Sequence, residues 1–172
     1  MNSRASTDVR PNGAFAVVTA IAMFVVAVLA AAAASAQDQP APKDTIFARK
    51  ILMDSIGRNM DELEGMTTSG KVDLAEGKDH ADIVSVMLQT FPHLFPPSTN
   101  QWKPTVPRDP GRDTFAAPEV WTNFSDFYSR SNAASRIAYK ASRTESVDEF
   151  KSLIGELRVA CDSCHGIYLK TE

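Results

Sequence analysis

Hydrophobic residues recur along this chain every three or four positions, which is the spacing of amphipathic helices rather than the alternation of strands. The pattern predicts four helices, at residues 45–65, 80–91, 118–143 and 147–169. Short connections join the first helix to the second and the third to the fourth, whereas a long segment separates the second from the third. We therefore predict an all-α fold, an antiparallel four-helix bundle with a long crossover between helices 2 and 3.

The first two predicted helices each have one apolar face and local signals for their ends. Gly65 is the stop signal of the first helix, whereas Asp79 caps the second and Pro92 ends it. The apolar face of the first helix consists of Ile46, Met53, Ile56, Met60 and Leu63, and that of the second consists of Ile83, Val84, Met87 and Phe91. We expect both faces to pack into one core.

The segment between the second and third helices is rich in proline, which predicts a long loop without regular structure. Phe95, Trp102 and Phe115 give this crossover apolar side chains with which to pack against the bundle. The third helix begins at Pro118. Its inward stripe is aromatic at first and small later, and consists of Trp121, Phe124, Tyr128, Ser131, Ala134 or Ser135, Ala138 and Ala141. The small residues fit either a flat cofactor or a close contact with another helix.

The fourth helix begins with a capping box formed by Ser146 and Glu149. Its apolar face consists of Phe150, Leu153, Leu157, Cys161, Cys164 and Tyr168. The only two cysteines of the chain therefore lie on the face that the helix turns towards the core.

The N-terminal segment has the pattern of a secretory signal peptide. Arg4 and Arg10 precede an apolar run at residues 15–34, and Ala34-Ser35-Ala36 supplies a cleavage site. We predict a cleaved signal peptide at residues 1–36, one four-helix domain at residues 37–172, and a periplasmic bacterial protein without a stable membrane anchor. Because the run is long enough to span a bilayer, retention as an anchor is the alternative.

The overall charge argues against one class of partner. The chain has 18 basic and 21 acidic side chains and a formal net charge of −3. A mildly acidic protein lacks the concentrated basic surface that nucleic acid requires. Catalysis is not predicted either, because no nucleophile and base or pair of carboxylates has a usable spacing.

Cys161-Asp162-Ser163-Cys164-His165 has the spacing by which haem is attached to c-type cytochromes. On a helix both thiols point to one side and reach the two vinyl groups of a haem, while His165 aims a ring nitrogen at the iron. A disulfide would close too short a loop to stabilise much. A zinc site would need further ligands, and the other histidines, His80 and His93, lie far away in sequence. A thioredoxin-type motif would need a βαβ unit. We predict one covalently bound haem c per chain.

The opposite side of the iron must be covered by another helix of the bundle. Met53, Met60 and Met66 lie on or near the inward side of the first helix, and a thioether is a good haem ligand. Methionine also fills cores, and the spacing alone leaves each of the three open to that simpler role.

Residues 45–168 resemble the class II c-type cytochromes, the cytochrome c prime family, and within it the low-spin c-556 branch. The resemblance lies in "RKILMDSIGRNMDEL" of the first helix, "FPHLFPPST" of the crossover, "PEVWTNFSDF" of the third helix and "VACDSCHGIY" of the fourth. It implies that His165 is the proximal and Met53 the distal axial ligand, with Met60 in the core. It also places Arg49 near the haem propionates, although a solvated helix charge is the simpler interpretation. Leu169 departs from the family pattern, which has an arginine four residues after the histidine.

These expectations predict a periplasmic electron-transfer protein with His/Met ligation and with redox partner proteins. The first alternative is a five-coordinate cytochrome c prime that binds nitric oxide or carbon monoxide at an open distal site, which Met53 merely crowds. The second is a haem-bearing interaction module without a redox role. Relatives in this family often dimerise through the first two helices, so a homodimer is a further option.

Overall fold

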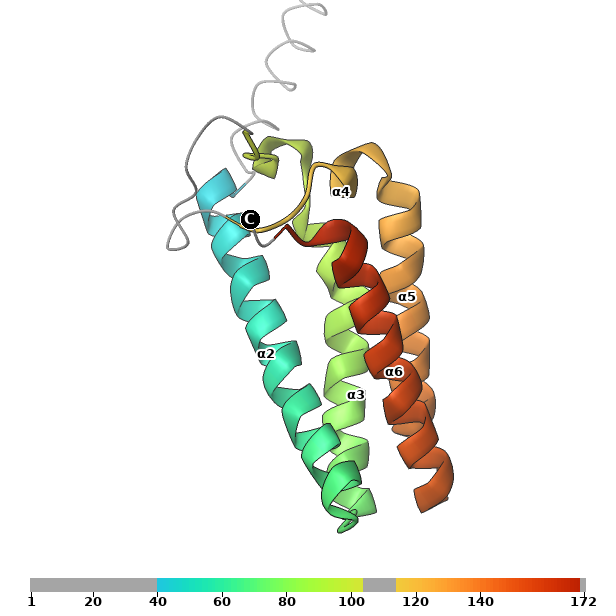
Figure 1. Cartoon of the computed structure of the whole chain (residues 1–172). Coiled ribbons are helices and arrows are strands. Elements are labelled where there is room, and N and C mark those ends of the chain that lie inside the picture. The colour runs from blue at the N-terminus through green and yellow to red at the C-terminus, as the bar shows by residue number, and fades with distance from the viewer. Residues whose placement is uncertain (1–39, 104–113, 171–172) are drawn as a thin grey trace, which may run out of the picture. The chain divides into compact units, whose positions relative to one another are not determined.

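The structure is a computed structural model in which residues 40–103 and 114–170 are described (Figure 1). The long helices are α2 (Pro42–Ser69), α3 (Leu74–Thr90), α5 (Phe124–Ala141) and α6 (Val147–Tyr168). The crossover from α3 to α5 contains two 3-10 turns, Phe91–Leu94 and Pro97–Thr99, and the short helix α4 (Glu119–Thr122). The described residues contain no β-strand. The predicted all-α bundle with a long crossover is confirmed.

The long helices run antiparallel in chain order (Figure 1). α3 packs along both α2 and α5, and α5 packs along α6, whereas α2 and α6 meet over a much shorter stretch. The first and last long helices therefore leave more room between them than the other neighbouring pairs do.

α2 is longer than predicted, because Gly65 does not end it. The helix continues to Ser69 and stops at Gly70, whose φ of 71° is the left-handed conformation common after helix ends. Gly65 is exposed within the helix. A single glycine costs about 1 kcal/mol there without stopping a helix that packs well on both sides of it.

α3 begins at Leu74, six residues before the predicted start. The carboxylate of Asp73 accepts hydrogen bonds from the backbone N–H groups of Ala75 at 3.0 Å and Glu76 at 3.2 Å, so Asp73 rather than Asp79 is the cap. Gly77, which resembles a linker residue in the sequence, is buried in the first turns. A Cβ at this position would lie 2.6 Å from Cζ of Phe150. Gly77 therefore lets the Phe150 ring of α6 pack directly against the backbone of α3.

The third predicted helix is divided, since Asn123, with φ −128° and ψ 44°, separates α4 from α5. Within α5, Phe127 is buried at 3% exposure, whereas Phe124 and Tyr128 are 39% and 40% exposed. The predicted inward orientation of Phe124 and Tyr128 is wrong, because α5 turns Phe127 towards the core on the same face as Ser131 and Ala138.

The small residues of α5 make a close helix contact. Ser131 Oγ donates to the carbonyl of Leu88 at 2.6 Å, and Ser135 Oγ donates to the carbonyl of Ser85 at 2.9 Å. These bonds require the backbones of α3 and α5 to lie near each other. Of the two explanations for the small residues, the helix contact is therefore correct.

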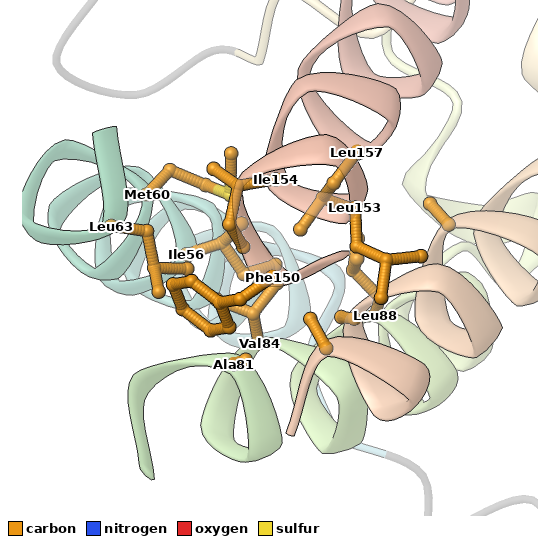
Figure 2. Packing of buried hydrophobic residues seen from close by; sticks show 13 residues of the cluster. Ile56, Met60, Leu63, Ala81, Val84, Leu88, Phe150, Leu153, Ile154 and Leu157 are labelled. Carbon is orange, nitrogen blue, oxygen red and sulfur yellow. The ribbon is translucent and has the colours of Figure 1, made fainter. Parts of the chain in front are cut away.

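The core consists of two apolar clusters. The bundle cluster contains Ile56, Met60, Leu63, Ala81, Val84, Leu88, Ala134, Ala138, Ala141, Phe150, Leu153, Ile154 and Leu157. Figure 2 shows the ring of Phe150 among residues of α2 and α3 in this cluster. The crossover cluster contains Phe91, Phe95, Val120, Phe127 and Tyr168. The two clusters join the four long helices to the crossover.

None of the helices in the described ranges combines the length and the hydropathy that a bilayer span requires. The predicted signal peptide at residues 1–36 lies outside the described residues.

Candidate haem-binding site

Cys161, Cys164 and His165 lie in the last turns of α6, and all three side chains are partly buried. Cys161 packs against the bundle cluster, whereas Cys164 packs against the crossover cluster. The helical spacing keeps both thiols and the imidazole on neighbouring positions of the helix surface. The attachment motif therefore lies where the two halves of the core meet.

Met53 of α2 lies at the same junction. Met53 and its neighbour Leu52 pack against both clusters, and both are only partly buried. Met60 is buried inside the bundle cluster and Met66 is partly buried near the end of α2. The structure thus brings Met53, and not Met60 or Met66, into the cluster that contains Cys164 as well as into the one that contains Cys161.

Burial controls the protonation of the motif. It lowers the pKa of His165, although the nearby Asp162 carboxylate acts in the opposite direction. Burial also raises the pKa of the Cys161 thiol, and it raises that of Cys164 to about 11. At neutral pH the two thiols are therefore protonated and the imidazole is neutral, with a nitrogen lone pair that can bind a metal.

A hydrogen-bonded network anchors the turn between the two cysteines to α5. Arg130 donates from an Nη atom to Ser163 Oγ at 2.9 Å and from Nε to Asp126 at 2.6 Å. Tyr168 donates its phenol proton to the same carboxylate at 2.6 Å. These bonds, led by that from Tyr168, lower the pKa of Asp126. Sequence reasoning missed the network, because the spacing of Asp126 and Arg130 indicates only a local ion pair.

An ion pair joins the motif to α2. Arg158 donates through Nε to Glu64 of α2 and lies 3.8 Å from the carboxylate of Asp162. The residues between the cysteines are therefore held from both neighbouring helices. No sequence signal pairs Glu64 with Arg158, since they are 94 positions apart.

Arg49 is buried and not a solvated helix charge, since its exposed fraction is 3%. One Nη atom donates to Thr99 Oγ1 at 2.8 Å and the other to Thr114 Oγ1 at 2.9 Å. Burial lowers the pKa of its guanidinium to about 10. Its Nε is also buried and has no hydrogen-bond partner among the described residues. Arg49 Nε can therefore still donate a hydrogen bond to an anionic group.

Leu169 acts through its backbone. Its side chain is exposed, and its N–H donates to the carbonyl of His165 at 3.0 Å. On either side of it, the carbonyl of Tyr168 accepts from Ala117 at 2.9 Å and the N–H of Lys170 donates to Phe115 at 2.7 Å. The end of the crossover is thereby fixed beside the attachment motif.

The residues present fit a haem c. Two thiols and a neutral imidazole share α6, a thioether and a leucine lie on α2, and a buried guanidinium has a spare donor for a carboxylate. The other histidines lie elsewhere: His80 Nδ1 is 2.8 Å from Asn59 Oδ1, and the ring of His93 packs against Tyr128. Across the described ranges, no three His, Cys, Asp or Glu side chains are placed to hold a metal ion.

Solved structures with the same fold are cytochromes c prime. The protein from Thermochromatium tepidum is 20% identical, with a TM-score of 0.65, and the match covers 76% of this chain and 98% of that one. A cytochrome c prime with an unusual ligand-controlled dimer dissociation is 20% identical, with a TM-score of 0.65 and coverages of 77% and 99%. The nitric oxide complex of a variant from Alcaligenes xylosoxidans is 17% identical, with a TM-score of 0.63 and coverages of 76% and 97%. At these identities the likeness establishes the fold. No curated protein matches the sequence.

The comparisons correct the functional prediction. The family model that matches residues 44–168 is that of cytochrome c prime, and the similar structures are cytochromes c prime, one of them holding nitric oxide. The c-556 branch is not supported, and the prediction of a low-spin electron carrier with His165 and Met53 as axial ligands is wrong. The match over residues 44–168 shows that this chain belongs to the cytochrome c prime family, whose members bind haem c.

Proposed function

We propose that this protein binds nitric oxide or carbon monoxide at an open distal site of one haem c. When bound, the haem would supply an iron that takes up the gas, and His165 would be the ligand that the protein provides to it. Cys161 and Cys164 would hold the haem through thioether bonds, and Arg49 Nε would donate to one of its propionates. The proposed role is reversible binding rather than catalysis.

The composition of the distal side carries this proposal. Leu52 and Met53 of α2 pack into the clusters that also contain the two cysteines, and they present apolar side chains. His80 and His93 are engaged with Asn59 and Tyr128 elsewhere in the bundle. Leu52 and Met53 bring neither a nitrogen ligand nor a polar group to this part of the described structure, which favours a small apolar gas. Met53 crowds the position without binding the iron.

The cellular setting follows from the covalent haem and from the N-terminal segment. We infer cleavage after residue 36 and residence of residues 37–172 in the periplasm, in agreement with the signal pattern. N-terminal sequencing of the exported protein tests this inference. Start at Gln37 supports it, whereas a membrane-bound chain that retains Arg4 contradicts it.

A homodimer is the proposed assembly. α2 and α3 expose large apolar side chains on their outward surfaces, namely Phe47, Ile51, Ile83 and Val86. Consecutive helices with such surfaces can pack against those of a second copy by two-fold symmetry. One cytochrome c prime of this fold forms a dimer whose dissociation is controlled by a ligand.

The optical spectrum of the purified ferric and ferrous protein tests the proposed function. We expect a high-spin spectrum in the absence of gas and a shift when carbon monoxide is added to the ferrous form. A low-spin ferrous spectrum without a carbon monoxide complex would overturn the proposal. Haem that remains on the chain after acid-acetone extraction, and is lost in Cys161→Ala with Cys164→Ala, would support covalent attachment.

Two variants of Met53 separate crowding from ligation. Met53→Leu retains a similar volume without sulfur, so its spectrum should match that of the unmodified protein. Met53→Ala removes the crowding, and we expect its affinity for carbon monoxide to rise by about tenfold, which is the effect of about 1.4 kcal/mol. Conversion from a low-spin to a high-spin spectrum in Met53→Leu would show that the sulfur binds iron and would refute the proposed role.

A further inference from the structure

The crossover is folded around the guanidinium of Arg49. One Nη atom contacts Thr99 Oγ1 at 2.8 Å and the carbonyl of Leu94 at 3.4 Å. The other contacts the carbonyl of Thr99 at 3.3 Å and Thr114 Oγ1 at 2.9 Å. Leu94 and Thr99 precede, and Thr114 follows, the part of the crossover that is not described. A single side chain of α2 therefore ties together both ends of this segment.

Two aromatic rings of the crossover pack against the same guanidinium. Its central carbon lies 4.5 Å from the ring centre of Phe95 and 5.5 Å from that of Trp121. Trp121 Nε1 donates to the carbonyls of Phe95 at 3.1 Å and Pro96 at 3.3 Å, and Thr99 Oγ1 donates to Pro96 at 2.8 Å. These contacts join the rings, the turn and the cation into one unit. The attraction between a cation and an aromatic ring is stronger where both are removed from water, as Arg49 and Phe95 are here.

This unit adjoins the candidate haem site. Phe95 belongs to the crossover cluster, and Trp121, Met53 and Cys164 pack against that cluster. Arg49 is one helical turn before Met53 on α2. Phe95 and Trp121 thus pack at the cluster that Met53 also contacts, and the cation that holds both rings, Arg49, lies on the same helix as Met53.

We propose that Arg49 is a positioning residue for the gas site, which fixes Phe95 and Trp121 of the crossover beside Met53 and so sets the access of gas to the distal side. This inference rests on the proposed function and is separate from the contact of Arg49 Nε with a propionate. This role requires the planar guanidinium of arginine, because its two Nη atoms contact Thr99 and Thr114 at the same time. A lysine ammonium is a point charge and cannot make both contacts in this geometry.

The test compares four variants of the haem-loaded protein. Arg49→Lys retains the charge and loses the planar guanidinium, and Arg49→Met removes both. Thr99→Val combined with Thr114→Val removes the hydroxyl partners and leaves the guanidinium in place. Arg58→Met, on an exposed position of the same helix, is the matched control. The association rate of carbon monoxide, the width of the C–O stretching band and the amide hydrogen exchange of residues 94–99 are measured for each.

We expect the two Arg49 variants and the threonine pair to behave alike, and the control to match the unmodified protein. The association rate of carbon monoxide should rise by about threefold or more in these variants. The charge-assisted hydrogen bonds of Arg49 with Thr99 and Thr114 are lost, so the crossover residues are held less tightly and the gas reaches the distal side more easily. The stretching band should broaden and exchange at residues 94–99 should accelerate. The exchange readout applies whether or not gas binds, and the threonine pair remains informative if Arg49→Met does not fold.

Three outcomes would overturn the inference. If Arg49→Lys matches the unmodified protein, the charge alone is sufficient. If the Arg49 variants change the rate and the threonine pair does not, the effect comes from the propionate and not from the crossover. If hydrogen exchange accelerates at residues 94–99 while the carbon monoxide association rate and the C–O stretching band stay unchanged, Arg49 stabilises the crossover without affecting the access of gas. An unmodified protein that binds no carbon monoxide would instead refute the proposed function.

Discussion

Gly77 offers a direct test of how the Phe150 ring of α6 packs against α3, because alanine at this position sets two opposing effects against each other. Within a helix, alanine in place of glycine stabilises the fold by about 1 kcal/mol. At Gly77, however, the added Cβ would lie 2.6 Å from Cζ of Phe150 and 3.1 Å from Cε1. The phenyl ring is fully buried in the bundle cluster and has no free direction in which to move.

The steric effect should win. An ordinary contact is 3.4–4 Å, so the ring edge must move by about 1 Å or α3 must shift away from α6. Overpacking of this size costs about 1–3 kcal/mol, which exceeds the gain in helix propensity. We expect Gly77→Ala to lower the free energy of unfolding by about 1 kcal/mol.

Gly65→Ala is the matched control, because a Cβ at Gly65 would meet nothing within 4 Å. It should raise the free energy of unfolding by up to about 1 kcal/mol, so that the two variants differ by about 2 kcal/mol. Guanidinium unfolding of the haem-loaded proteins, followed by circular dichroism, measures both. Gly77→Ala should also become neutral or stabilising in a Phe150→Leu background, since contacting residues couple. A Gly77→Ala protein as stable as Gly65→Ala would refute the packing argument.

Two further predictions concern the α5–α6 network and the outer surface. The pKa of Tyr168 is raised to about 12, chiefly by burial and then by its hydrogen bond to Asp126. The neutral phenol therefore stabilises the fold fully below pH 10, and this stabilisation is lost as the pH rises towards about 12. Tyr168→Phe should abolish a tyrosinate absorbance step near pH 12; a step that persists would contradict this assignment. Phe47, 66% exposed on α2, should lie in the dimer interface, so Phe47→Glu should raise the dimer dissociation constant by about tenfold or more in sedimentation experiments. The exposed substitution Val159→Glu on α6 is the control, and equal dissociation constants for both variants would exclude this interface.

The fold was predictable because its determinants are local. The three- and four-residue spacing identified four helices, and Ser146 marked the start of α6, where its Oγ accepts from the N–H of Glu149 at 3.3 Å. The errors arose where tertiary contacts override a local signal. Gly77 resembles a loop residue until Phe150 is seen against it, and the break at Asn123 carries no proline or glycine to announce it.

The place of the candidate attachment motif was predictable for the same reason, since Cys161, Cys164 and His165 lie within five consecutive residues of one helix. The surroundings of the motif were not, because they are assembled from distant segments. Arg49 reaches Thr114 across 65 positions, and Arg158 reaches Glu64 across 94. Residue type alone assigns an exposed position to an arginine on a helix. Only the fold shows that the guanidinium of Arg49 replaces water with threonine hydroxyls and aromatic rings.

Met53 marks the limit of inference from residue identity. Met53 packs against both core clusters, one of which Cys161 also contacts and the other Cys164. The step from position to ligation was wrong, because a thioether near a haem can bind the iron or merely fill space. Which of these occurs depends on whether the helix bearing the sulfur can approach the iron. How closely α2 approaches depends on its packing against α3 and against the crossover that Arg49 contacts. The presence of a methionine does not determine it. The same contacts that position the distal wall therefore decide whether the site stays open to gas.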